Sequence, residues 1–260
     1  MKTWSRAIWI TLAVLAPLVG RAQAVFYGVD TSSTLYSIDP KNWMATSIGP
    51  VGGSMFLEGL AISPTGQLYG TNDSGNLYAV DTTTGAATLI GDTGRGNIEA
   101  LDFVGSTLVG ANFSSTPALF SIDLSTGTTT TLVAAGSLTG VPRAMAAVDS
   151  NTVLIAADGA PNSLYSANLT TGTVSLLGTM SMTGQFLAMD LASNGVLYGF
   201  GNAGEVWEIN PANGALTLLG NTGSQYWLDV TTMAVPEPST WILLGAGLVP
   251  LAATLRRQRA

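Results

Sequence analysis

Carboxylates are the side chains of this sequence that are best suited to chemistry. The 260 residues include sixteen Asp and Glu but no histidine and no cysteine. Without histidine, a Ser-His-Asp or Cys-His nucleophile cannot be built, and most zinc, copper and haem sites lose their usual ligands. Two carboxylates could still hydrolyse a glycosidic bond, one as acid and the other as base. Glycoside hydrolysis is therefore the reaction class that the composition leaves open.

An internal repeat must position these carboxylates. A short apolar segment ending in Asp or Asn recurs at residues 35–39, 77–81, 119–123, 164–168 and 206–210, with spacings of 42, 42, 45 and 42 residues. In the last four copies a glycine follows four residues later, whereas Trp43 stands at that place in the first copy. Each unit is expected to form four short strands with turn residues between them. Four strands in about 42 residues are typical of a β-propeller blade.

The phase of the repeat predicts how the ring closes. The body begins at 25–29 with a segment that corresponds to the second strand of a unit, and it ends at 226–234 with one that corresponds to a first strand. The C-terminal strand can then complete the first blade, which removes exposed sheet edges. We therefore predict an all-β, five-bladed propeller over residues 25–234.

First strands of propeller blades line the central channel, which defines the candidate site. Glu58, Glu99 and Arg143 stand at one equivalent position of the predicted first strands, and Asp102 and Asp190 stand three residues further on. Together with Asp229, these side chains could converge near the channel mouth. Channel walls are polar by default, so we favour an inert channel and no catalytic residue. The alternative is a glycoside hydrolase that uses these carboxylates. Pairing of Arg143 with Glu58 or Glu99 would favour the inert channel.

The other repeated polar residues are interpreted as structural. An Asp or Asn that opens a hairpin bonds to its own backbone, and the following glycine supplies a positive φ. This interpretation covers Asp39, Asp81, Asp123, Asn168 and Asn210. The oxygen-rich loops at 30–33, 72–76 and 92–97 lack the spacing of a dedicated calcium loop, and no phosphate-binding or dinucleotide motif is present. We expect no metal and no cofactor.

The C-terminal residues 235–260 have the order of a sorting signal. A short polar motif consists of Val235, Pro236, Glu237, Pro238, Ser239 and Thr240, and an uncharged span follows at 241–255. Arg256, Arg257 and Arg259 then close the chain, and such a cluster favours the cytoplasmic side of a membrane. This tail resembles the PEP-CTERM sorting signal of Gram-negative bacteria. The resemblance implies an exported protein that is held in the inner membrane until an exosortase processes it.

The N-terminal residues 1–24 resemble a secretory signal peptide. Lys2 and Arg6 precede an apolar stretch at 7–19, and Ala22 and Ala24 form an A-x-A cleavage site. Cleavage there would leave Val25 as the first residue of the mature protein.

The charge of the body restricts its partners. Of nine basic residues only Lys41, Arg95 and Arg143 lie in the body, whereas every acidic residue except Glu237 does, which gives the body a formal charge of −12. Such a surface repels phosphate backbones, so we expect no nucleic acid partner. We expect an exported, non-enzymatic surface or matrix protein, associated with exopolysaccharide or biofilm as the tail implies.

Overall fold

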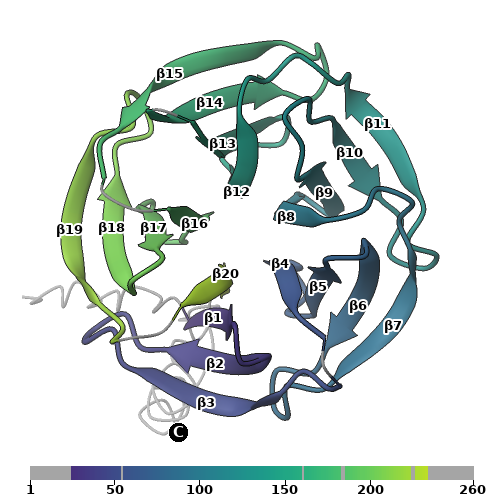
Figure 1. The fold of residues 1–260 in the computed structure, drawn as a ribbon, viewed down its shortest axis with the longest axis vertical. Helices are drawn as coiled ribbons and strands as arrows, with labels where there is room; N and C mark the ends of the chain where they lie inside the picture. The colour runs from purple at the N-terminus through teal and green to yellow at the C-terminus, as the bar shows by residue number, and fades with distance from the viewer. Residues whose placement is uncertain (1–24, 54, 160, 183–184, 224–225, 234–260) are drawn as a thin grey trace, which may run out of the picture. The chain divides into compact units, whose positions relative to one another are not determined.

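The computed structural model describes residues 25–53, 55–159, 161–182, 185–223 and 226–233. These residues form five four-stranded antiparallel sheets arranged as blades around a central axis (Figure 1). The innermost strand of each blade contacts the innermost strands of both neighbouring blades, so the ring is closed. The predicted five-bladed propeller is confirmed.

The four strands of each blade follow one another from the axis to the rim. Blade A contains β20 (Trp227–Met233), β1 (Val25–Asp30), β2 (Thr34–Ile38) and β3 (Ala45–Pro50). Blade B contains β4 (Leu57–Ile62), β5 (Leu68–Asn72), β6 (Asn76–Val80) and β7 (Ala87–Asp92). Blade C contains β8 (Ile98–Val104), β9 (Thr107–Asn112), β10 (Leu119–Ile122) and β11 (Thr129–Val133). Blade D contains β12 (Val141–Ala147), β13 (Thr152–Asp158), β14 (Asn162–Asn168) and β15 (Val174–Met180). Blade E contains β16 (Phe186–Leu191), β17 (Leu197–Gly201), β18 (Glu205–Ile209) and β19 (Leu216–Asn221).

Blade A is closed by the strand from the other end of the body. Strand β20 pairs with β1 in an antiparallel register that runs from Val25 opposite Met233 to Val29 opposite Asp229. The fully buried Trp227 packs at this seam in one cluster with Phe26 and Phe200. The predicted closure of the first blade by a C-terminal strand is therefore confirmed.

The hairpin turns follow the predicted Asp/Asn chemistry. In blade B the Asp81 carboxylate accepts hydrogen bonds from the backbone N–H groups of Thr83 and Thr84, at 2.7 and 3.0 Å. Gly85 has φ +83° and its N–H donates to the Asp81 carbonyl. In blade A, Trp43 adopts φ +60° at the same position, a conformation that L-residues rarely take. Its ring packs edge-on against Phe26 and Tyr198, so contacts across the seam between blades A and E support this strained residue.

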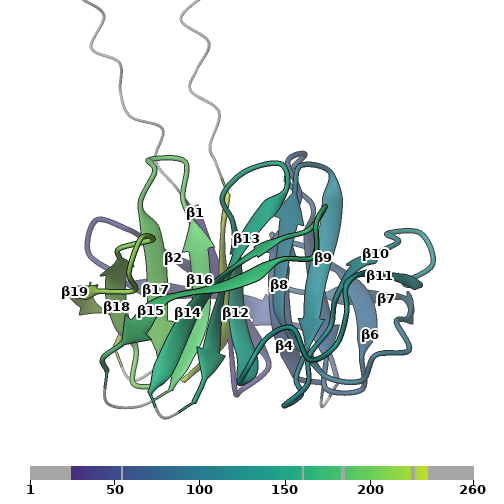
Figure 2. The same ribbon diagram turned by 90° about the horizontal axis from the view of Figure 1, so that it is seen from above.

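Each innermost strand has a bulge near its start, where one extra residue interrupts the register with the second strand. These residues are Glu58, Glu99, Arg143, Leu187 and Leu228. A bulge re-aims a side chain at the point where it occurs. All five innermost strands start at one end of the ring and run along the axis, as the turned view shows (Figure 2). The five bulges therefore place five side chains at the same mouth of the channel.

The predicted targeting segments lie outside the described residues. They are the signal peptide at 1–24, the motif at 235–240, the uncharged span at 241–255 and the basic residues at 256–260. Within the described ranges, no helix has the length and apolar character that crossing a membrane requires.

Candidate functional site

Two sets of residues stand at the end of the ring where the innermost strands start. One set consists of the bulge residues Glu58, Glu99, Arg143, Leu187 and Leu228. The other consists of the residues two positions earlier, which are Phe56, Asn97, Val141, Gln185 and Tyr226. We call these ten residues the bulged mouth. Its polar side chains come mainly from blades B, C and D, and its apolar bulge residues come from blades E and A.

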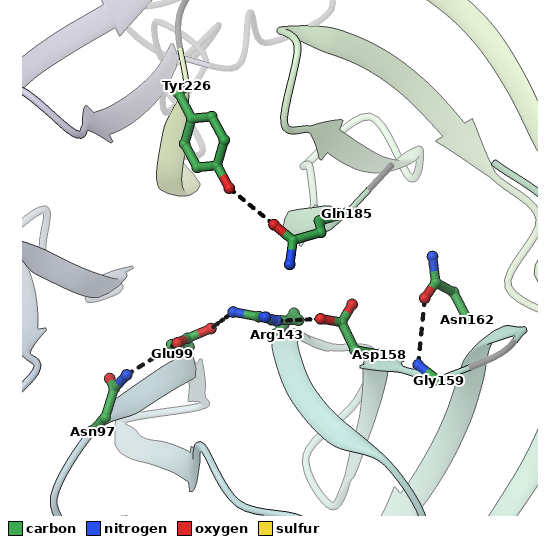
Figure 3. Close-up of polar contacts among 8 residues, drawn as sticks. All are labelled: Asn97, Glu99, Arg143, Asp158, Gly159, Asn162, Gln185 and Tyr226. Atoms are coloured by element: carbon green, nitrogen blue, oxygen red, sulfur yellow. Dashed lines mark hydrogen bonds and ion pairs between the residues drawn. The ribbon is translucent and has the colours of Figure 1, made fainter. Parts of the chain in front are cut away.

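An ion-pair network organises the polar side of the bulged mouth (Figure 3). Arg143 Nη1 lies 2.7 Å from Glu99 Oε2, and Arg143 Nε bonds to Asp158 Oδ2 at 2.5 Å. The amide of Asn97 donates to the other oxygen of Glu99 at 3.0 Å. The Arg143 guanidinium also lies over the ring of Phe113, 4.6 Å from its centre. These contacts join blades C and D and fix the orientation of Glu99.

Burial and charge raise the pKa values of both glutamates of the bulged mouth. For Glu99, desolvation raises the pKa above its ordinary value, although Arg143 and Asn97 lower it. For Glu58, desolvation is again the main cause, and the charges of Glu99 and Asp73 raise the pKa further. Unlike Glu99, the Glu58 carboxylate makes no hydrogen bond or ion pair to another described residue. Glu58 is therefore the acidic group of the mouth that a ligand could reach.

The six predicted channel residues do not converge at one mouth. Glu58, Glu99 and Arg143 lie at the bulged mouth, whereas Asp102, Asp190 and Asp229 lie further along their strands. Asp102 and Asp190 line a pocket at the opposite end, together with Pro64 and Met233. The expectation of a single cluster is thus wrong. Asp102 and Asp190 stand three positions beyond the bulge residues Glu99 and Leu187, an advance of about 10 Å along the strand, whereas Asp229 directly follows the bulge residue Leu228.

We call Asp102, Asp190 and Asp229 the channel triad, and each member bonds to the backbone of the next blade. Asp102 Oδ2 accepts from the N–H of Ala147 at 2.6 Å, and Asp229 Oδ2 accepts from the N–H of Leu60 at 2.7 Å. Asp190 Oδ2 accepts from the N–H of Thr232 and from the hydroxyl of Thr231. The donors belong to innermost strands, whose inner edges have no strand partner. The triad therefore satisfies buried backbone groups that would otherwise lack acceptors.

The triad carboxyls are desolvated in this role. Burial raises the pKa values of Asp102 and Asp229 well above their ordinary range, and the neighbouring charge of Asp190 raises both further. Burial also raises the pKa of Asp190, although the bonds from Thr232 and Thr231 lower it. Arg143, the basic residue on an innermost strand, is engaged with Glu99 and Asp158 at the other end. The triad is thus a set of like charges held by hydrogen bonds.

These arrangements limit the chemistry of the channel. Glu99 is neutralised by Arg143, and the triad carboxylates are bonded to backbone groups. Among the described residues, no three His, Cys, Asp or Glu side chains are grouped so that they could hold a metal ion. The pairing of Arg143 with Glu99 is the outcome that favours the inert channel over the hydrolase.

Replacing Arg143 tests how much the ion-pair network contributes to the stability of the fold. We expect Arg143→Met to lower the free energy of unfolding by about 3 kcal/mol at pH 7.5, because it leaves Glu99 buried without its cation. The loss should shrink as the pH falls, since protonated Glu99 no longer needs the cation. Chemical denaturation at pH 7.5 and pH 5 measures both effects.

Arg95 provides a matched control for this experiment. Its guanidinium also lies over a phenylalanine ring, that of Phe120, but it bonds to the hydroxyls of Thr129 and Thr131 instead of to carboxylates. Arg95→Met should therefore lower the free energy of unfolding by less than Arg143→Met does, and this loss should not shrink at low pH. Equal losses for the two variants at both pH values would contradict the proposed electrostatic role of Arg143.

Comparison with known families decides the nature of the tail. Residues 234–259 match the family model of the PEP-CTERM protein-sorting motif. The chain carries a PEP-CTERM sorting motif. This motif implies processing by an exosortase and export in a Gram-negative bacterium. The resemblance noted from residues 235–260 is thereby confirmed.

Solved structures support the fold of the body. A chain in the crystal structure of a nidogen/laminin complex is similar, with a TM-score of 0.58, 17% identity, and coverage of 82% of this chain and 81% of that one. A protein of unknown function from Bacteroides caccae has a TM-score of 0.50 and 10% identity, with coverage of 76% and 73%. No curated protein matches the chain. At these identities the similarity concerns the fold alone.

Sequence reasoning missed half of the bulged mouth. Asn97 and Gln185 precede the predicted first strands, and Tyr226 opens one. Asp158 and Phe113 lie beside the mouth, at the end of β13 and directly after β9. A signal for the first three was present, because they stand two positions before Glu99, Leu187 and Leu228 in the aligned repeat. Nothing local pointed to Asp158 or Phe113, which join the site through pairing between strands.

Proposed function

We propose that this chain is an exported, non-enzymatic surface or matrix protein that is associated with exopolysaccharide in a biofilm. One observation supports this role above others: the sorting motif at 234–259 follows a propeller in which Arg143 neutralises Glu99 and backbone groups engage the channel triad. A chain of similar fold comes from a nidogen/laminin complex, and this makes binding to another macromolecule a reasonable role for such a body.

The tail supplies the proposed route to the cell surface. The span at 241–255 carries no charge and is followed by three arginines, so it would halt in the inner membrane with its C-terminus in the cytoplasm. Proline has no N–H to donate to a β-ladder, so Pro236 and Pro238 would favour an extended motif that an exosortase could reach. The signal peptide at 1–24 would start export, with cleavage after Ala24.

A glycoside hydrolase remains the second candidate function. Glu58 favours it, because a partly buried carboxyl with a raised pKa and no hydrogen-bonded partner resembles a general acid. Release of new reducing ends from the host polysaccharide, abolished by Glu58→Gln, would establish this alternative. No release by the wild type supports the non-enzymatic role.

The C-terminus of the native protein tests the sorting proposal. We expect mass spectrometry of the protein from its own host to find a C-terminus at or near residues 236–239, without residues 241–260. Replacing Pro236, Glu237 and Pro238 by alanine should leave the body exported but retained in the inner-membrane fraction. Recovery of the wild type outside the cell with Arg259 still attached would contradict the proposal.

A further inference from the structure

We propose that the bulged mouth is a binding site for a neutral, hydroxyl-rich glycan chain. This inference rests on the proposed association with exopolysaccharide and assigns it to one face of the propeller. Every blade contributes residues to the bulged mouth.

Exposed aromatic rings gather at this end of the ring. Phe56 is 42% exposed, Phe113 is 40% exposed and Tyr226 is 38% exposed. Phe56 and Tyr226 directly precede innermost strands, and the N–H of Phe113 bonds to the carbonyl of Asn97 beside the start of β8. Large apolar side chains exposed together mark an interaction surface. Aromatic rings bind the C–H face of a pyranose ring, and Tyr does so at low entropic cost because it has few rotatable bonds.

Polar groups accompany these rings at the same end of the propeller. Gln185 accepts from the Tyr226 hydroxyl at 2.9 Å, and its amide N–H groups bond to no other described residue (Figure 3). Glu58 offers acceptor oxygens, and Asp158 uses one oxygen for Arg143. The mouth therefore presents a donor and several acceptors. A hydroxyl group both donates and accepts, so a chain of sugar hydroxyls can satisfy both kinds of group.

Charge selects a neutral glycan over an anionic one. The described charged residues at the bulged mouth are Glu58, Glu99 and Arg143, and Asp158 lies beside them. Asp73 adds a further negative charge to the surroundings of Glu58. Anionic polymers and phosphates are repelled by this surface and by the body charge of −12. A neutral sugar carries no such penalty.

The closing strand ends away from this mouth. The sorting motif follows Met233 in the sequence, and Met233 pairs with Val25 at the end of the ring where the innermost strands finish. The bulged mouth lies at the end where these strands start. The last described residue of the closing strand, Met233, therefore lies at the end of the ring opposite to the proposed glycan site.

The test is binding of the full chain, extracted from its producing cells, to an array of neutral oligosaccharides and to the host polysaccharide in affinity gels. We expect wild-type binding to a neutral glycan, at least about tenfold weaker binding for Phe56→Ala and Tyr226→Ala, and near wild-type binding for Tyr226→Phe, which keeps the ring. The control is Leu89→Ala on β7. Leu89 is a large apolar side chain that is 58% exposed, but it lies on an outer strand, away from the bulged mouth. Alginate serves as the anionic probe.

Several results would overturn the inference. One is the absence of neutral-glycan binding, and another is preferential binding to alginate. A third is an equal loss of glycan affinity in Leu89→Ala and Tyr226→Ala while thermal melting shows that both variants remain folded. The two proposals fail separately. If wild type and Tyr226→Ala bind the host polysaccharide equally, the mouth assignment is wrong and the matrix role stands. If the host polysaccharide is not bound but a neutral array glycan is bound through Tyr226, the matrix role is wrong and the site stands.

Discussion

Removing residues 226–234 should abolish folding of the propeller. The deletion takes β20 from blade A, which leaves β1 with an unpaired edge and opens the seam that Trp227 fills. It also removes Asp229 and leaves Asp190 buried without its bonds from Thr231 and Thr232. Loss of a buried Trp alone costs about 3–5 kcal/mol, which is comparable to the whole stability of many domains. We therefore expect aggregation and no cooperative thermal transition.

Two truncations of the mature body make this experiment sharp. One ends at Ala234 and the other at residue 225, so both lack the sorting segment and they differ only in the closing strand. The longer chain should be monomeric and should melt in one transition, whereas the shorter chain should do neither. Size-exclusion chromatography and circular dichroism compare them. If the shorter chain stays monomeric and melts at the same temperature, the closing strand does not hold the ring together.

Most of this fold was predictable because the sequence repeats at a constant interval. The spacing of Asp39, Asp81 and the later copies fixed the number of blades, and the phase of 25–29 and 226–234 predicted that the two ends share a blade. These inferences need only the order of apolar and turn residues. They do not depend on which side chains meet.

The site was less predictable because it depends on bulges and on contacts between blades. The repeat identifies Glu58, Glu99 and Arg143 at one position and Asp102 and Asp190 three residues later. Only the structure shows that this offset carries Asp102 and Asp190 to a pocket at the other end of the ring. Trp43 is a second case in which a contact between blades could not be predicted from the sequence. The missing glycine was evident in the sequence, but the positive φ of Trp43 is supported by Tyr198, a residue of the last blade.

The thermal stability of the body should fall as the pH rises above 5. Burial raises the folded-state pKa values of Asp102, Asp190 and Asp229. The stabilisation by such groups is fully present below their unfolded pKa of about 4 and is lost as the pH rises through their folded pKa values. Glu58 and Glu99 have raised pKa values too and act in the same direction. We expect the melting temperature to be more than about 5 °C lower at pH 8.5 than at pH 5.

The turn carboxylates oppose this trend only at lower pH. The hydroxyl and N–H of Thr83 lower the pKa of Asp81, and Ser125 does the same for Asp123. Their contribution is present above the unfolded pKa of about 4 and is lost as the pH falls through the lowered folded values. The stability of the body should therefore be greatest at mildly acidic pH and should fall on both sides.

Asp190→Asn separates the triad from the general effect of net charge. A single oxygen of Asp190 accepts the bonds from both Thr232 and Thr231, so the asparagine carbonyl can keep both while the charge is removed. Because the charge of Asp190 raises the pKa values of Asp102 and Asp229, removing that charge also makes both groups easier to ionise. The variant should melt above the wild type at pH 8.5 and close to it at pH 4.5. Glu208→Gln, which removes one exposed carboxylate on β18, changes the net charge equally and should leave the pH dependence unchanged. Two results would show that the triad does not control the stability of the ring. One is a wild type with a higher melting temperature at pH 8.5 than at pH 5, and the other is a Glu208→Gln variant whose melting temperature depends on pH as weakly as that of Asp190→Asn.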